Sequence, residues 1–213
     1  NYYNNDSAIE AAISTHLEKM RFGGIYDHII GGFCRYSTDE KWKVPHFEKM
    51  LYDNAQLISL YATAYKKFSL AVYKEIVLET ISFLASELAN NQGGYHCAID
   101  ADSEGVEGKY YSWEYEAFNE VIDNKLTAAY FNILKKGNWE DGTNLLYITK
   151  SKKTFCKEFS IGENELEECL QTAKSKLNLS RSKRIKPQID NKLITSWNAL
   201  LLAGLIDSYS ITH

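Results

Sequence analysis

The stretch "GGIYDHIIGGFCRYSTDEKWKVPHFEKMLYDNAQL" (residues 23–57) contains two glycine pairs, two histidines and five acidic residues, and it ends with helical periodicity. The residues before it are also periodic at helical spacing. A connection between two helices usually needs only about 2–8 residues, and longer ones often carry function or structure of their own. We therefore expect residues 23–49 to fold over the end of the second helix and to present polar side chains there.

The segments on either side of this stretch predict a helical domain. Ser7 and Glu10 form an S-x-x-E capping box for the first helix, which should end at the first glycine pair. Apolar residues cover most of the circumference of residues 50–68, so this helix should be buried among several neighbours. Residues 71–89 carry a single apolar stripe, so that helix should lie outside.

The rest of the chain alternates short elements with longer helices. We expect a β-hairpin from "YHCAID" and "KYYSW", short helices near 115–122 and 125–135, a strand at 144–149, an amphipathic helix at 163–177 and an apolar helix at 194–209. The basic run at residues 181–186 is typical of a solvated connector rather than of a binding patch.

Two apolar helices resemble each other. "NAQLISLYATAY" (residues 54–65) and "NALLLAGLIDSY" (residues 198–209) share an initial Asn-Ala and a final Tyr, with matching apolar positions between them. Such self-similarity indicates repeated helical hairpins, and inner and outer helices that alternate around an axis form an α/α toroid. The alternative is a chance similarity between two apolar helices. The fold class that we predict is mainly α-helical, a partial α/α toroid with small β-hairpins in its loops.

Composition excludes several classes of function. The net charge is −4 with no basic stripe, which argues against nucleic acid as a partner. No apolar run approaches the roughly 18 residues of a membrane span, and we expect any targeting peptide to be absent or already removed, because no n-region, h-region and cleavage site open the chain. Four cysteines without a C-x-x-C pair argue against zinc and against a dithiol redox centre. We expect one cytoplasmic domain over residues 1–213, without a cofactor, a metal or a membrane contact.

Three blocks carry a family resemblance: residues 23–57, "DADSEGVEGKYYSW" (100–113) and "DNKLITSWNALLLAGL" (190–205). In this order they resemble the YyaL-type, spermatogenesis-associated thioredoxin-like proteins. That resemblance implies a thioredoxin-fold domain followed by an α/α toroid like those of six-hairpin glycosidases and N-acylglucosamine epimerases. The chain has no thioredoxin motif, so it resembles a fragment, the N-terminal portion of the toroid. Cys34 stands where family members often carry a histidine.

The resemblance gives a substrate class by analogy, and the residues suggest how a sugar would be held. "FCRYS" and "KWKVP" should pair as a hairpin over the open end of the toroid. A sugar-converting site needs an acid and a base that titrate near neutral pH, charged groups for hydroxyls and aromatic platforms. The candidate catalytic residues are His28, His46, Asp27, Glu48, Asp53, Asp100 and Asp102, and the candidate substrate-binding residues are Arg35, Tyr36, Trp42 and Trp197.

A metal site has weaker support in the sequence. "DADSEG" (100–105) alternates acidic residues before a glycine, as a calcium loop does, but the twelfth position from Asp100 is Tyr111 instead of the bidentate Glu. His28, His46 and Asp100 match no recognised spacing of metal ligands. We therefore predict no metal, and expect the acidic turn to point into the mouth of the toroid.

A second hypothesis is a non-catalytic module, in which the loops hold the hairpins together and the toroid binds a ligand or partner for the attached thioredoxin domain. The two hypotheses differ in geometry. Convergence of Asp27, His28, His46 and Asp102 within about 7 Å around an open cavity would favour a catalytic site. Side chains that point into loops and bond to the backbone would favour the scaffold.

Overall fold

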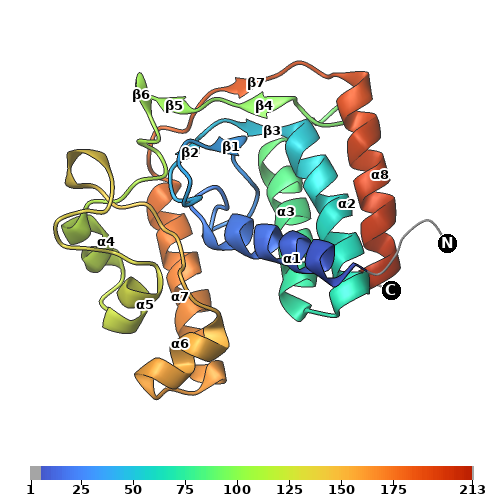
Figure 1. Cartoon of the computed structure of the whole chain (residues 1–213). Helices are drawn as coiled ribbons and strands as arrows, with labels where there is room; N and C mark the ends of the chain where they lie inside the picture. Colours follow the sequence, from blue (N-terminus) through green and yellow to red (C-terminus); the bar gives the residue numbers. More distant parts are fainter. Residues whose placement is uncertain (1–5, 213) are drawn as a thin grey trace.

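The computed structural model describes residues 6–212, and within that range the chain is mainly helical (Figure 1). The helices are α1 (Ser7–Phe22), α2 (Leu51–Phe68), α3 (Ala71–Glu87), α4 (Tyr115–Val121), α5 (Lys125–Tyr130), α6 (Lys152–Phe159), α7 (Glu163–Arg181) and α8 (Thr195–Thr212), with a 3-10 turn at Glu140–Gly142. The strands are β1 (Tyr36–Ser37), β2 (Pro45–His46), β3 (Lys49–Met50), β4 (Ala98–Ile99), β5 (Asp102–Ser103), β6 (Val106–Glu107) and β7 (Ile189–Asp190).

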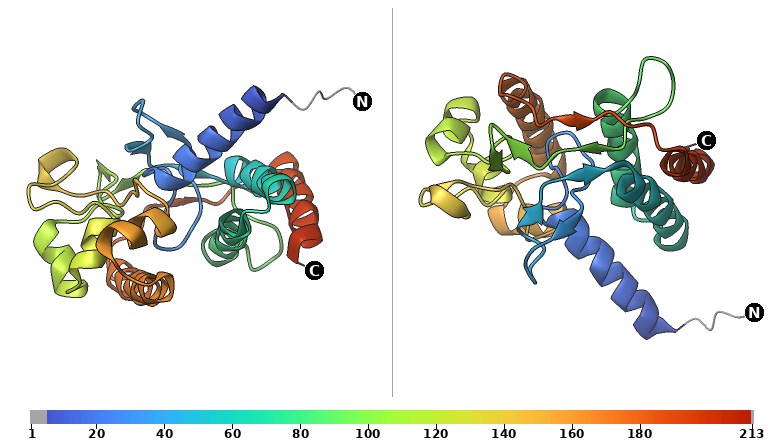
Figure 2. Two further views of the ribbon diagram at one scale, coloured as in Figure 1. Left: turned by 60° about the horizontal axis from the view of Figure 1, so that its bottom comes forward. Right: turned by 90° about the horizontal axis from the view of Figure 1, so that it is seen from above.

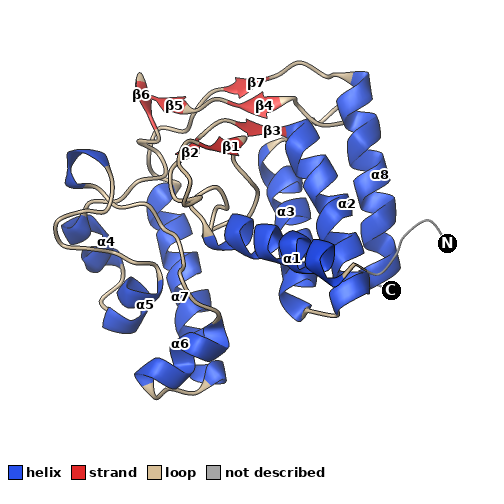
Figure 3. Cartoon of the chain, in the orientation of Figure 1, coloured by secondary structure: helices blue, strands red, loops and turns tan. Residues whose placement is uncertain are grey.

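The strands form small antiparallel pairs at one end of the helices (Figure 3). β1 pairs with β2, so the hairpin predicted within residues 33–45 is confirmed, with Tyr36 opposite His46. β4 lies between β3 and β7 in a three-stranded sheet. β3 comes directly before α2 and β7 lies in the segment before α8, so this sheet connects the two segments that lead into these helices. The mainly helical fold with small β-hairpins in its loops, as predicted for a partial α/α toroid, is thus confirmed.

Several local predictions need correction. The capping side chain of α1 is Asp6, whose carboxylate accepts from the backbone N–H of Ala8 and Ile9, so Ser7 is the first helical residue. "YHCAID" and "KYYSW" do not pair with each other, because β4 is taken up by β3 and β7 and the tighter β5–β6 hairpin forms between them. Residues 144–149 make only a single bridge, from Asn144 to Trp113. Helix α6 was not predicted.

The similarity of the two apolar helices is structural. α2 and α8 lie side by side, with α3 on the other flank of α2 (Figures 1 and 2). The Asn54 carboxamide accepts from the Phe33 N–H at 2.7 Å and donates to the Phe33 carbonyl at 3.0 Å. The Asn198 carboxamide makes the same two bonds to Tyr95, at 2.8 and 3.0 Å. Each asparagine also donates to the carbonyl four residues earlier.

The loop residue held by each asparagine follows a glycine pair with positive φ. Gly31 and Gly32 both have φ of 81°, and Gly93 and Gly94 have φ of 101° and 80°. Left-handed backbone of this kind favours glycine over other residues. The repeated unit therefore has two parts. One is a glycine pair with left-handed backbone followed by an aromatic residue, and the other is an asparagine in the first turn of a helix, whose side chain bonds to the backbone of that aromatic residue. This shared geometry supports a repeated unit.

Two large apolar clusters make up most of the core of residues 6–212, with two smaller ones beside them. One large cluster joins α1, α2, α3 and α8, and the other joins α4 to α7 with the segment after residue 144. Ile30 packs against both clusters. The polar face of α3 is directed at the second half of the chain, because Glu79 and Glu87 pair with Lys174 and Lys186 at 2.7 Å each. Among residues 6–212, none of the helices combines the length and apolar character that crossing a membrane requires.

Asn54→Ala should lower the free energy of unfolding by about 2–4 kcal/mol, because it leaves the buried N–H and C=O of Phe33 without partners. Gln56→Ala, an exposed position on the same helix, should change it by less than about 0.5 kcal/mol. Urea unfolding measures both. Equal, small effects of the two variants would show that the asparagine bonds are not needed.

Candidate functional site

Asp27 is the centre of a buried ion cluster. Its Oδ2 lies 2.8 Å from the Lys49 ammonium and 3.0 Å from Nη2 of Arg181, and its Oδ1 accepts from Nη1 of Arg181 at 3.1 Å. Oδ1 also accepts from the backbone N–H of Ile29 at 3.0 Å. Burial opposes ionisation, yet the two cations outweigh it and hold the pKa of Asp27 well below its usual range. Asp27 is therefore a permanent anion that joins the loop, β3 and α7.

The cluster corrects two interpretations of the sequence. Lys49 follows Glu48 and would pass for half of a surface pair at a helix start, but it is fully buried. Arg181 was assigned to a solvated connector, but it ends α7 with 1% of its surface exposed. A signal for Arg181 did exist, because it continues the buried stripe of α7, which is formed by Leu166, Leu170, Ala173 and Leu177.

His28 is buried beside this cluster and contacts the backbone. One ring nitrogen lies 3.0 Å from the Gly23 carbonyl, and the ring packs edge-on against Tyr26. Burial lowers the pKa of His28 to about 4, so the imidazole is neutral at physiological pH. Its neighbour Tyr26 donates to Glu79, which also pairs with Lys174.

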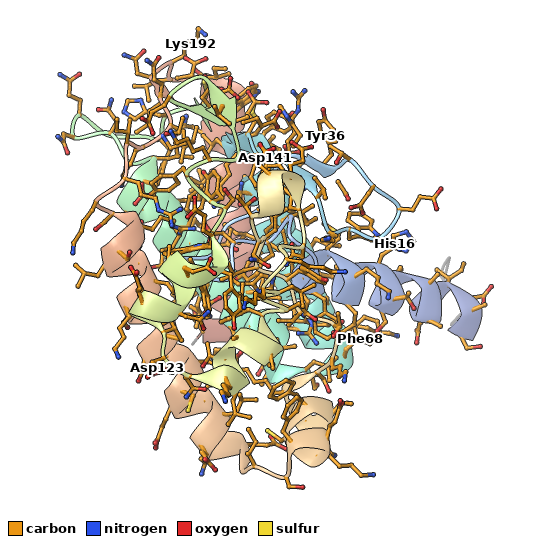
Figure 4. All side chains as sticks on the ribbon, turned by 90° about the vertical axis from the view of Figure 1, so that its left-hand side faces the viewer. His16, Tyr36, Phe68, Asp123, Asp141 and Lys192 are labelled. Carbon is orange, nitrogen blue, oxygen red and sulfur yellow. The ribbon has the colours of Figure 1, made fainter. Side chains whose placement is uncertain are left out.

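A separate, open cleft of about 540 Å³ lies between α1, the start of α2 and the β1–β2 hairpin. Four predicted site residues line it: Arg35, Tyr36, Trp42 and Asp53. The remaining wall includes Met20, Ile25, Cys34, Asp39, Gln56 and Leu57. This volume is within the range of small-molecule sites, and the wall combines aromatic faces with charged groups. Figure 4 shows Tyr36, on strand β1 of the hairpin, toward the opposite end of the molecule from Asp123.

Asp53 is a carboxylic acid with a raised pKa in the cleft. Its Oδ2 is buried and has no hydrogen-bond partner among the described residues. Burial raises the pKa of Asp53 to about 6, while Arg35 opposes the rise and Glu48 adds to it. A carboxyl group that titrates near neutral pH and has an oxygen free to bond is suited to accept or donate a proton.

A row of charged side chains borders the cleft. Arg35 pairs with Glu48 at 3.1 Å, and Nε2 of His46 lies 3.7 Å from the same Glu48 oxygen. Nδ1 of His46 lies 2.7 Å from the Glu107 carboxylate on β6, and the His46 ring stacks on Tyr36 at 5.1 Å. The contact with Glu107 is one that the sequence did not predict. The arrangement places an imidazole between two carboxylates next to the cleft.

Trp42 is held at the cleft in a strained conformation. It has a φ of 61°, which is rare for a bulky residue. Asp39 fixes the surrounding turn, since its carboxylate accepts from the backbone N–H of Lys41, Lys43 and Val44. The Trp42 carbonyl accepts from the Gly24 N–H at 2.9 Å, and a Cβ at Gly23 would lie 2.0 Å from that carbonyl oxygen. The glycine pair therefore gives room for the tryptophan.

The other candidates lie elsewhere. Asp100 and Asp102 are exposed around β5, and Trp197 packs edge-on against Tyr52 at 4.7 Å. The structure thus does not gather Asp27, His28, His46 and Asp102 around one cavity. Asp27 bonds to the backbone and to two buried cations, and His28 bonds to the backbone, whereas His46 is partly exposed and pairs with Glu107. Among residues 6–212, no group of three or more His, Cys, Asp and Glu side chains is placed to hold a metal ion.

No family model matches the chain. Human spermatogenesis-associated protein 20 is 30% identical over 223 residues, and the mouse protein is 30% identical over 215. An uncharacterised protein of Caenorhabditis elegans is 32% identical over 224 residues. These matches include 88–92% of this chain but only 27–31% of the relatives, so the chain spans less than a third of their length.

These relatives confirm the resemblance to spermatogenesis-associated proteins that the three sequence blocks predict. Among solved structures, the crystal structure of D-mannose isomerase aligns with the whole chain and 48% of its own, with a TM-score of 0.41 and 15% identity.

Asp27→Asn should lower the free energy of unfolding by about 3–5 kcal/mol at pH 7, because two buried cations lose their anion. The folded pKa of Asp27 is depressed, so its contribution is present above the unfolded value of about 3.9 and is lost as the pH falls further. The difference between wild type and variant should stay constant from pH 5 to 8 and shrink below about pH 4. Glu158→Gln, in the exposed pair with Lys150, is the control and should have little effect. Chemical denaturation across pH measures this.

Asp53→Asn should act in the opposite direction. The raised pKa means that the cost of ionising Asp53 in the folded state grows as the pH rises from the unfolded pKa of about 3.9 to the folded pKa of about 6. The cost disappears below about pH 3, where the carboxyl is protonated in both states. The variant should gain about 1 kcal/mol at pH 8, a value reduced because the group is only half-buried, and nothing at pH 3. A loss of stability at pH 8 would contradict the assignment.

Proposed function

We propose that this chain, which resembles part of the spermatogenesis-associated protein 20 family, carries a carbohydrate-binding site in the cleft between α1, α2 and the β1–β2 hairpin. The observation that carries the proposal is Asp53, a residue that lines the open cleft with Arg35 and Trp42 and that has a buried oxygen without a hydrogen-bond partner among the described residues. An unpaired polar oxygen is costly unless something bonds it. The hydroxyl groups of a sugar are suitable partners.

The other groups of the wall fit the same ligand class. Tyr36 and Trp42 offer aromatic faces, on which the apolar face of a pyranose ring can stack. The Arg35 guanidinium has five N–H donors in a planar fork, of which the pair with Glu48 uses one. A hydroxyl-rich ligand would therefore meet donors, an acceptor and an apolar surface in one cleft.

Processing of the sugar, as in an epimerase or a glycosidase, requires proton transfer. Asp53 is the candidate acid or base because its pKa of about 6 lies close to neutral. His46 is the candidate partner, because its ring lies between the carboxylates of Glu48 and Glu107 next to the cleft. In this proposal Glu48 orients both Arg35 and His46.

The second hypothesis, a non-catalytic module, is favoured by Asp27 and His28. Both were candidates for catalysis, and both contact backbone groups inside the fold. These two residues would then be part of a scaffold that serves the domain attached to it in the longer relatives. Under this hypothesis the cleft binds a ligand or a partner segment without changing it. A cytoplasmic location stays a prediction of the sequence.

Binding of mono- and disaccharides and sugar phosphates to the full-length protein, measured by thermal shift and calorimetry, tests the proposal. At least one sugar should raise the unfolding midpoint by a few degrees. Trp42→Ala should weaken its affinity by at least about fivefold, the size of one lost aromatic contact, and Asp53→Asn should weaken it as well. Trp139→Ala, which alters a different surface cleft, and Asp123→Asn are the matched controls and should leave affinity unchanged.

Binding that survives Trp42→Ala and Asp53→Asn would place the sugar elsewhere and contradict the proposal. If a sugar binds at the cleft and incubation leaves its configuration and linkages unchanged, the binding module is favoured over the enzyme. If no sugar binds, the carbohydrate proposal fails and the scaffold hypothesis replaces it.

A further inference from the structure

The ion cluster around Asp27 has more positive than negative charge. Asp27 is the one carboxylate within contact of Lys49 and Arg181 in the part of the chain that the structure describes. Arg184 adds a third cation nearby. Burial lowers the pKa of Arg184, and the positive charge of Arg181 lowers it further. The nearby Glu79 is already paired with Lys174 and Tyr26. An unbalanced charge in a buried site is costly unless a counter-ion compensates it.

Arg181 also has a donor that is not used. Its Nε is buried and has no hydrogen-bond partner among residues 6–212, whereas Nη1 donates to Asp27. The central carbon of the guanidinium lies 5.3 Å from the centre of the Tyr110 ring. A buried guanidinium N–H without an acceptor is rare in native structures. The unused donor belongs to the same side chain that carries the excess charge.

A small cavity adjoins this side chain. Arg181, Asp27, His28, Cys34 and Tyr111 line it, and it has room of about 30 Å³ for the centre of a water-sized particle. That is enough for one atom-sized occupant and too little for a sugar. Burial raises the pKa of Cys34 to about 12 and that of Tyr111 well above its usual value, so both keep their protons and are neutral donors.

We propose that this cavity binds one small inorganic anion of the size of chloride, held by the free Arg181 Nε–H and by the excess charge of Lys49 and Arg181. The Asp27 carboxylate does not exclude it, because its oxygens are engaged by Lys49, Arg181 and the Ile29 N–H. Cys34 lines both this cavity and the sugar cleft, so the anion would lie directly behind the cleft wall. The site is independent of whether the cleft binds sugar.

Thermal unfolding of the full-length protein tests the proposal, with sodium gluconate replaced by sodium chloride at constant ionic strength. Chloride should raise the unfolding midpoint by about 3–6 °C with saturation at one site, as a ligand that binds only the folded state does. Bromide should act similarly, and gluconate is too large to enter. Arg181→Lys, which keeps the charge but removes Nε, should abolish the chloride dependence. Lys150→Met, in an exposed ion pair, is the control and should retain it.

A midpoint that does not depend on chloride, or a dependence that survives Arg181→Lys, would overturn the proposal. If Arg181→Lys does not fold, crystals of the wild-type protein soaked in bromide decide the question. Anomalous scattering should then show one bromide within about 3.5 Å of the Arg181 Nε, a hydrogen-bonding distance for a large anion. No bromide at that position would mean that the cavity holds water.

Discussion

The contact of Asp27 with Lys49 and Arg181 is the constraint on which the rest of the structure depends. It joins three segments, the last of which is separated from Asp27 by 154 residues. Buried ion pairs add little net stability compared with apolar packing, but removing one partner is strongly destabilising. The cluster therefore acts mainly by selecting one arrangement of the loop, β3 and α7. Ile30, three residues later, packs on both apolar clusters, so the same loop also joins the two halves of the core.

The rigid interior allows strain at the cleft. Trp42 has a left-handed backbone and Asp53 has a buried, unpartnered oxygen, and each would lower stability if considered alone. They are tolerated because the Asp39 turn, the glycine pair and the asparagine bonds to the loop backbone hold the surrounding chain. A strained backbone and a carboxyl group with a raised pKa that lie together in an open cleft are typical of functional sites.

Much of this could be predicted from local sequence. The apolar periodicity of residues 50–68 and 194–209 predicted two helices, and the structure has α2 and α8 there. The shared Asn-Ala predicted a repeat, and in the structure Asn54 and Asn198 make the same pair of hydrogen bonds to the backbone of an aromatic residue. The hairpin of β1 and β2 was predicted, and four of the candidate residues named from the sequence, Arg35, Tyr36, Trp42 and Asp53, line the same cleft. Lys49 and Arg181 were missed because each lies in a charged run that is typical of surface. Their burial depends on Asp27, and sequence spacing does not show such a long-range contact.

The central claim is that the cleft beside Trp42 is the binding site, and the indole N–H signals of the chain's tryptophans test it most directly. The four tryptophans, Trp42, Trp113, Trp139 and Trp197, lie in different environments, so each reports on a different region. Titration of the full-length protein with the sugar that shifts its unfolding midpoint should move the Trp42 signal saturably and leave that of buried Trp113 in place. A sugar that binds while the Trp42 signal stays fixed, or that moves Trp139 instead, would contradict the account.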